Sequence, residues 1–243
     1  MEYKYETVSR SFEDFASGKV LFNARGTTSF PVRLGSEIYL RAKSYLRSTG
    51  NKDRITLYDP CCGGAHLLTA IGILHGHDMK RMIGSDIEPD VVEVAIRNLG
   101  LINLDGINAR MEQLTQMVNE FGKDSHRQAV ESARRLKEQI VQRNTTLTAT
   151  CFQADATAEA EYDDRSLGAV DMVITDLPYG NMVKWTSDSA NPAEKLLENL
   201  LPRLSSDAVV AVIADKKQVI QNANYKRLQK FKIGKRQVVF LQK

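Results

Sequence analysis

The sequence predicts an α/β fold in which helices cover both faces of a mostly parallel sheet. Three observations support this prediction. Short apolar runs alternate with helical segments, two of the runs end in loops rich in aspartate, glycine and proline, and the last two runs are only two residues apart. Apolar runs of about four to eight residues are typical of strands in a parallel sheet, and their alternation with helices favours a doubly wound sheet with right-handed crossovers.

Seven strands and several core helices are expected along the chain. The expected strands are residues 55–59, 81–86, 146–152, 170–175, 209–214, 228–233 and 236–241. The expected core helices cover 66–74, 91–101 and 192–201. Pro89 suits the first position of the second helix. Gly234 and Lys235 suit a two-residue hairpin turn between the last two strands. A parallel sheet that finishes in an antiparallel hairpin is typical of the Rossmann-like class I methyltransferases.

Residues 1–243 are expected to form one domain, with a core over 53–243 and two additions. Residues 1–52 hold an aromatic-rich arm and a helix that starts near Ser36. Residues from about 106 to 144 predict an antiparallel helical hairpin that packs on the core. The apolar face of the helix near Ser36 holds Ile38, Ala42, Tyr45 and Leu46. The apolar stripes of the hairpin are Met111, Leu114, Met117 and Phe121 on one helix and Val130, Ala133, Leu136 and Ile140 on the other.

Composition is that of a globular protein from a reducing compartment. The chain is 42% hydrophobic and 26% charged, and no apolar run approaches the ~20 residues of a membrane span. Its start lacks the apolar block of a signal peptide, so a cytoplasmic protein is expected. The three cysteines form no disulfide framework, and the histidines show no metal-ligand spacing with them, so no metal is expected. A monomer is the favoured oligomeric state.

The charged residues are distributed unevenly. Residues 216–243 contain nine Lys or Arg and no Asp or Glu, whereas acids cluster at Glu159, Glu161, Asp163 and Asp164. Such a polarised surface favours a polyanion as partner. A solvated strand-and-turn surface explains the same charges, so both interpretations stay open.

The first expected strand ends in a loop suited to a nucleotide cofactor, Asp59-Pro60-Cys61-Cys62-Gly63-Gly64. Glycine at this place lets a ligand approach bare backbone amides. The Asp59 carboxylate suits the ammonium group of a ligand and would repel a pyrophosphate. The patterns G-x-G-x-x-G and G-K-[ST] are absent, which excludes NAD and P-loop nucleotides. We interpret Cys61 and Cys62 as small packing residues of the turn.

Two further acids are expected to contact the same cofactor. Asp86, followed by Ile87, comes roughly 20 residues after the glycines, the spacing typical of an acid that binds ribose hydroxyls. Asp155, followed by Ala156, comes after the third expected strand and can accept a hydrogen bond from an adenine amino group. An aspartate that only caps the next turn has the same sequence pattern.

A second loop, Asp176-Leu177-Pro178-Tyr179, follows another buried strand and suits an amino group on a flat heterocycle. The Asp176 carboxylate, which also lies near the cofactor, and the Leu177 carbonyl are acceptors for N–H groups, while Pro178 fixes the turn. Tyr179 can stack on a base, a contact worth ~1–3 kcal/mol. With the first loop, this pattern predicts methyl transfer from S-adenosylmethionine to a base nitrogen by positioning alone. An ionised aspartate only accepts hydrogen bonds, which suits the N1–H and N2 amino group of guanine.

Further runs resemble the avilamycin-resistance methyltransferase family over nearly the whole chain, the helical insertion included. They are residues 30–34 with 36–38, 59–63, 121–123, 133–136, 176–180 and 232–234. The resemblance implies a Rossmann-like enzyme that binds S-adenosylmethionine and methylates a guanosine of large-subunit (23S) ribosomal RNA, for which we expect N2 as the acceptor. The chain departs from such enzymes at Ala65, where glycine is common. Antibiotic resistance does not follow, because a housekeeping relative can modify another base.

The expected RNA contacts, on phosphates or on bases beside the target, are Arg25, Arg33, Lys184, Trp185, Lys216 and Lys217. Structured RNA must present its target base splayed or flipped. Two alternatives stay open. The acceptor can be an adenine amino group or a protein glutamine amide, or the chain can bind RNA without catalysis.

Overall fold

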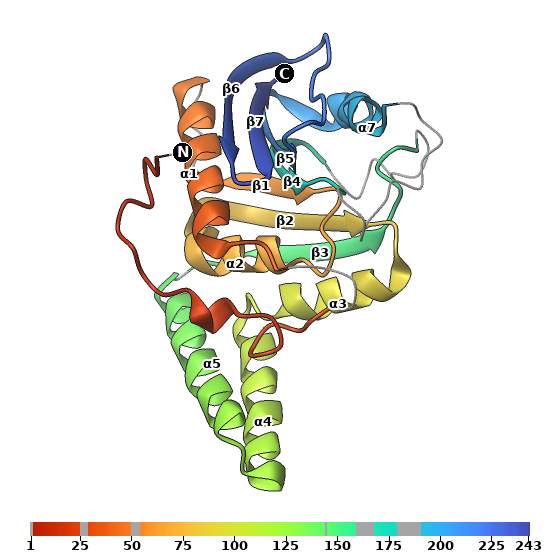
Figure 1. The fold of residues 1–243 in the computed structure, drawn as a ribbon. Coiled ribbons are helices and arrows are strands. Elements are labelled where there is room, and N and C mark those ends of the chain that lie inside the picture. Colours follow the sequence, from red (N-terminus) through yellow and green to blue (C-terminus); the bar gives the residue numbers. More distant parts are fainter. Residues whose placement is uncertain (1, 25–28, 50–53, 144, 159–167, 179–190) are drawn as a thin grey trace.

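The computed structural model describes residues 2–24, 29–49, 54–143, 145–158, 168–178 and 191–243. Its centre is a seven-stranded sheet with the order β3-β2-β1-β4-β5-β7-β6 (Figure 1). The strands are β1 (Ile55–Asp59), β2 (Met79–Asp86), β3 (Thr148–Gln153), β4 (Val170–Asp176), β5 (Leu204–Asp215), β6 (Lys226–Ile233) and β7 (Arg236–Gln242). The first five strands run parallel, and β7 lies antiparallel to both β5 and β6. The predicted α/β fold is confirmed.

Helices cover the two faces of the sheet. The helices are α1 (Val32–Thr49), α2 (His66–His75), α3 (Pro89–Gly100), α4 (Leu104–Phe121), α5 (Asp124–Arg143) and α7 (Pro192–Leu200). Successive strand residues point to opposite faces, so Leu57 of β1 packs in the core shared with α1 and α2, whereas Tyr58 packs in the core shared with α7. Pro89 occupies the start of α3, as the sequence predicts.

The sheet reverses its strand order between β1 and β4, because β2 and β3 extend to one side and β5 to the other. Open α/β sheets bind ligands at such a switch point, beyond the carboxyl ends of the strands. Asp59, Asp86 and Asp176 are the last residues of β1, β2 and β4. The fold therefore brings these three predicted site residues to one edge of the sheet.

The helical insertion is the antiparallel pair α4 and α5, which projects from the sheet on the side away from β6 and β7 (Figure 1). Gly122, with φ +62°, ends α4 in the left-handed conformation that favours glycine. Four stripe residues are buried as predicted: Leu114, Ala133, Leu136 and Ile140. Phe121 is 59% exposed, so its prediction as a core residue is wrong. It is the last residue of α4, where the hairpin has left the body of the protein.

The helix α1 begins four residues earlier than the sequence predicts, at Val32 instead of Ser36. Ser36 is not the helix cap, because it lies within the helix. Its buried hydroxyl donates to the Glu6 carboxylate and lies 2.7 Å from Nε2 of His75. The strand β5 also begins earlier than predicted, at Leu204. The prediction misses this first part because three polar residues precede the apolar run of the strand. Among the described residues, no helix is long and apolar enough to cross a membrane.

Candidate active site

Carboxylates gather at the carboxyl edge of the sheet, where β1, β2 and β4 end. Asp59 is 2% exposed. Burial, together with the nearby carboxylates of Asp176 and Asp86, raises the pKa of the Asp59 carboxyl to about 7, although the Thr175 hydroxyl and the Cys61 N–H lower it. Burial without a cation disfavours the charged form of a carboxyl. The site is therefore suited to a cationic ligand.

The loop after β1 is held by hydrogen bonds from its backbone N–H groups to aspartate carboxylates. The Cys61 N–H donates to Oδ1 of Asp59 at 3.1 Å, and the Gly63 N–H donates to Oδ2 of Asp86 at 2.8 Å. The other oxygen of Asp86 accepts the Glu88 N–H at 3.2 Å. Asp86 thus ties the glycine loop to the end of β2. Gly63 has φ +52°, which explains the need for glycine there.

Gly64, whose predicted contact with the cofactor stays a prediction, also packs closely against another segment of the chain. A Cβ on Gly64 would lie 2.9 Å from the Cβ of Ala24, so the missing side chain leaves room for the N-terminal arm. Asn98 of α3, which is fully buried, joins the two segments. Its amide donates to the carbonyls of Gly64 at 2.7 Å and Phe22 at 3.0 Å, and its oxygen accepts the Phe22 N–H at 2.8 Å.

Asn98 is a site residue that the sequence analysis misses. The available signal is its position: an amide three residues after Ala95 lies on the buried face of α3. A buried amide needs hydrogen-bond partners, so such a residue marks a contact with another segment. Ala65 is fully buried in the left-handed conformation, with φ 55°, at the start of α2.

The cysteines pack as the sequence predicts. Burial and the carboxylates of Asp59 and Asp86 raise the pKa of the Cys61 thiol. The Cys62 thiol lies 3.7 Å from that of Cys151, and this contact together with burial raises its pKa as well. A thiol with a raised pKa is a poor nucleophile at neutral pH.

The remaining predicted cofactor residues continue along the same edge. Oδ1 of Asp155 accepts the N–H and the hydroxyl of Thr157, at 2.8 and 2.7 Å. This is the turn-capping arrangement that the sequence left open. The Ala156 carbonyl accepts a hydrogen bond from Asn199 at 3.1 Å, and the Ile87 carbonyl accepts one from Gln153 at 3.0 Å. Pro60 lies buried directly after β1.

The second loop begins at the end of β4. The Leu177 N–H donates to the Ile213 carbonyl of β5 at 2.9 Å, and the Leu177 side chain is buried. This bond fixes the chain directly after Asp176. Pro178 is half-buried. Tyr179 lies outside the described residues, so its predicted stacking stays a prediction.

The predicted RNA contacts fall into three groups. Arg25, Lys184 and Trp185 lie outside the described residues. The Arg33 guanidinium donates to the carbonyls of Glu6 and Thr7 at 2.8 and 3.3 Å, so it holds the N-terminal arm on α1. Lys216 and Lys217 are exposed directly after β5.

Comparison with known proteins decides the family. The family described as rRNA methyltransferase AviRa matches residues 1–236. A 23S rRNA (guanine(2535)-N(1))-methyltransferase of Streptomyces viridochromogenes is 37% identical, over 98% of this chain and 95% of its own. The chain belongs to the AviRa rRNA methyltransferase family.

Solved structures agree with this membership. The AviRa structure from S. viridochromogenes at 1.5 Å superposes with a TM-score of 0.87 and 34% identity, and it covers all of this chain and 96% of that one. A second AviRa structure from the same organism, at 2.4 Å, gives 0.86 and 36% over the same shares. TrmN from Thermus thermophilus gives 0.54 at 13% identity, over 89% of this chain and 50% of that one, which shows a shared fold.

S-adenosylmethionine is the cofactor of AviRa-type class I methyltransferases, and the residues at the switch point fit it. Its amino acid part carries an ammonium group, which suits the buried Asp59 carboxylate with its raised pKa. Asp86 stands at the end of β2, the position of the ribose-binding acid in doubly wound nucleotide sites. When bound, the cofactor supplies an electrophilic methyl group.

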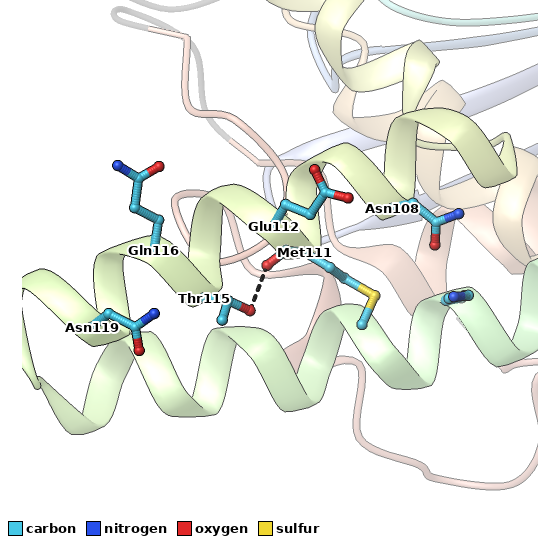
Figure 2. Close-up of a pocket in the computed structure, with 7 residues that line it drawn as sticks. Asn108, Met111, Glu112, Thr115, Gln116 and Asn119 are labelled. Carbon is cyan, nitrogen blue, oxygen red and sulfur yellow. Dashed lines mark hydrogen bonds between the residues drawn. The ribbon is translucent and has the colours of Figure 1, made fainter.

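A groove of about 640 Å³ lies elsewhere, along α4 of the insertion (Figure 2). Its lining is mostly polar and consists of Asn108, Met111, Glu112, Thr115, Gln116, Asn119 and Lys137. The Thr115 hydroxyl donates to the Met111 carbonyl within the helix at 2.8 Å. None of the acids at the carboxyl edge lines this groove, so it is separate from the methyltransferase site.

Proposed function

We propose that this AviRa family member methylates a guanine of 23S ribosomal RNA with S-adenosylmethionine. One observation carries the proposal: Asp59, Asp86 and Asp176 meet at the switch point of the sheet, in a chain that matches a 23S rRNA guanine methyltransferase along nearly its whole length. Asp59 and Asp86 face the cofactor. Asp176 faces the acceptor base.

The acceptor atom that we propose is N1. The sequence analysis favours N2, whereas the S. viridochromogenes relative is named for N1. Both atoms carry hydrogen on the same edge of guanine, so an ionised carboxylate can accept from either one. The name of the relative supports N1, and Asp176 then holds the N1–H and takes its proton as the methyl group arrives. The protein thus contributes two effects, which are positioning of the base and acceptance of its proton.

The experiment uses purified protein, labelled S-adenosylmethionine and separate samples of protein-free 23S and 16S rRNA. The proposal predicts RNase-sensitive label in 23S rRNA and little in 16S rRNA. Label that survives RNase and stays with added ribosomal protein would contradict it and support a glutamine amide as the acceptor. Cofactor binding without transfer to any RNA or protein would instead support a non-catalytic RNA-binding protein.

A further inference from the structure

Two basic turns lie side by side beyond β5 and β7. The turn after β5 carries Lys216 and Lys217, and the hairpin turn between β6 and β7 carries Lys235. The Lys216 N–H donates to the Lys235 carbonyl at 3.0 Å, which joins the turns. Lys232 is exposed next to the hairpin turn. We name these four lysines, 216, 217, 232 and 235, the basic rim.

The basic rim stands next to the second loop of the active site. Asp176 pairs in register with Ile213 of β5, and Asp215 pairs with Arg236 of β7. Strands rise about 3.3 Å per residue, so the end of β5 extends roughly 7 Å past the level of Asp176. Neighbouring strands are about 4.8 Å apart, which places the hairpin turn about 10 Å to the side. The rim is therefore a raised wall on one side of the acceptor site.

Buried contacts fix the shape of this wall. Gln237, the second residue of β7, is fully buried at the start of an otherwise apolar buried run. Its amide donates to the carbonyls of Asp215, at 2.8 Å, and Gln218. The Lys217 N–H donates to Oδ1 of Asp215 at 2.8 Å. A turn held this way loses little freedom when a ligand binds.

The four positive charges of the basic rim stand against the carboxylate of Asp215, whose Oδ1 accepts the Lys217 N–H. None of its four lysines forms an ion pair with a described residue, and residues 216–243 contain no Asp or Glu. Lysines on an edge strand can serve to prevent edge-to-edge pairing, which accounts for Lys226 and Lys230 along β6. That explanation does not cover Lys216, Lys217 and Lys235, which lie in turns. Free cations beside an acceptor site suit phosphates.

We propose that the basic rim is the docking surface for the sugar-phosphate backbone of the RNA next to the target base. The proposal rests on the proposed function, since it assumes that the acceptor is RNA. The groove along α4 is less suited to this partner, because Glu112 stands in it together with Lys137. Phosphate contacts fix register and orientation and carry no sequence information. The rim therefore aligns the RNA, while the second loop selects the base.

The test removes two charges from the basic rim, by Lys216→Gln with Lys235→Gln, in the full-length protein. The matched control removes two lysines from the insertion, by Lys123→Gln with Lys137→Gln. Binding to a protein-free 23S rRNA transcript is measured from 50 to 300 mM salt, a range of about sixfold. Each lost phosphate contact lowers the slope of log affinity against log salt by about 0.7–0.9, so the rim variant should lose about 1.5.

The rim variant is further expected to raise the Kd for the transcript about tenfold at 100 mM salt, in keeping with two lost contacts. Its cofactor Kd and melting temperature should stay at wild-type values, and the control should match wild type throughout. An unchanged slope for the rim variant, or an equal loss in the control, would overturn the proposal. Failure of the wild type to methylate any RNA would instead count against the proposed function.

Discussion

At the scale of single residues, the site depends on carboxylates that differ in environment. Asp59 is buried and its pKa is raised to about 7. Both carboxylate oxygens of Asp86, in contrast, accept hydrogen bonds from backbone N–H groups of the loops around it. Asp176 stands where β4 ends and the second loop begins. The three residues therefore have different surroundings, although the sequence shows the same side chain at the end of three strands.

Asp176→Asn is expected to remove the acceptor for the base proton while the cofactor still binds. General base contributions are about 10²–10⁴-fold, so kcat should fall by at least ~100-fold with the cofactor Kd changed less than about threefold. Single-turnover methylation and a binding titration measure the two quantities. Asp207→Asn is the control, since it makes the same change near the other end of β5. An Asp176→Asn enzyme with full activity would remove this residue from the mechanism.

Asp59→Asn is expected to stabilise the free enzyme at pH 8 and to leave it unchanged at pH 4. Below about pH 4 the carboxyl is protonated in both folded and unfolded chains. Between about pH 4 and 7 only the unfolded chain ionises, so stability is lost as the pH rises. Each pH unit between the two pKa values is worth about 1.4 kcal/mol. Thermal unfolding at both pH values measures the gain.

The same variant should bind S-adenosylmethionine at least about tenfold more weakly at pH 8, because an amide does not attract an ammonium group as a carboxylate does. Equilibrium dialysis checks this loss. A variant that is more stable and binds the cofactor normally would show that Asp59 is no ligand of the ammonium group.

At the scale of elements, the N-terminal arm packs against the loop that we propose for the cofactor. It runs down to η1 (Glu13–Phe15) beside α5 and then passes along α3 (Figure 1). Arg135 of α5 pairs with Asp14 at 2.6 Å, and Arg110 of α4 donates to the Val20 carbonyl at 2.9 Å. Asn98 then joins the arm to Gly64 of the cofactor loop. The insertion thus holds the arm that packs on this loop.

Asn98→Ala is expected to weaken both stability and cofactor binding. It leaves the carbonyls of Gly64 and Phe22 and the Phe22 N–H without their partner, at a cost of about 1–3 kcal/mol for a buried group. Melting temperature and cofactor Kd should change together. Tyr225→Phe is the control, because it removes a buried hydrogen bond to the Leu197 carbonyl, on the face of α7. That variant should lower the melting temperature alone, and an equal cofactor effect in both would contradict a specific role of Asn98.

The elements of the sheet are the part that the sequence predicts best. Strand β1 and the hairpin turn at Gly234 and Lys235 are placed as predicted, since apolar runs and turn residues are local signals. The start of α1, the exposure of Phe121 and the roles of Gly64 and Asn98 depend on contacts between distant segments. Periodicity within one segment does not contain that information.

At the scale of the whole molecule, the charged groups of the candidate site and the helical insertion lie at different edges of the sheet. The carboxyl ends of the parallel strands carry the acids and the basic rim, whereas the insertion projects from the side away from β6 and β7 (Figure 1). The strand order and the switch point could be predicted from the fold class. The choice between N1 and N2 could not, because one carboxylate accepts from both atoms and only the pose of the base separates them.

The most direct test of the account is nucleoside analysis by mass spectrometry of 23S rRNA after incubation with the wild-type enzyme and S-adenosylmethionine. The Asp176→Asn enzyme provides the background. We predict N1-methylguanosine that is present with the wild type and absent with the variant. N2-methylguanosine would correct the acceptor atom and keep the site. Methylated adenosine would contradict the assignment of guanine as the substrate, and a 23S rRNA without new methyl groups would contradict the proposed activity.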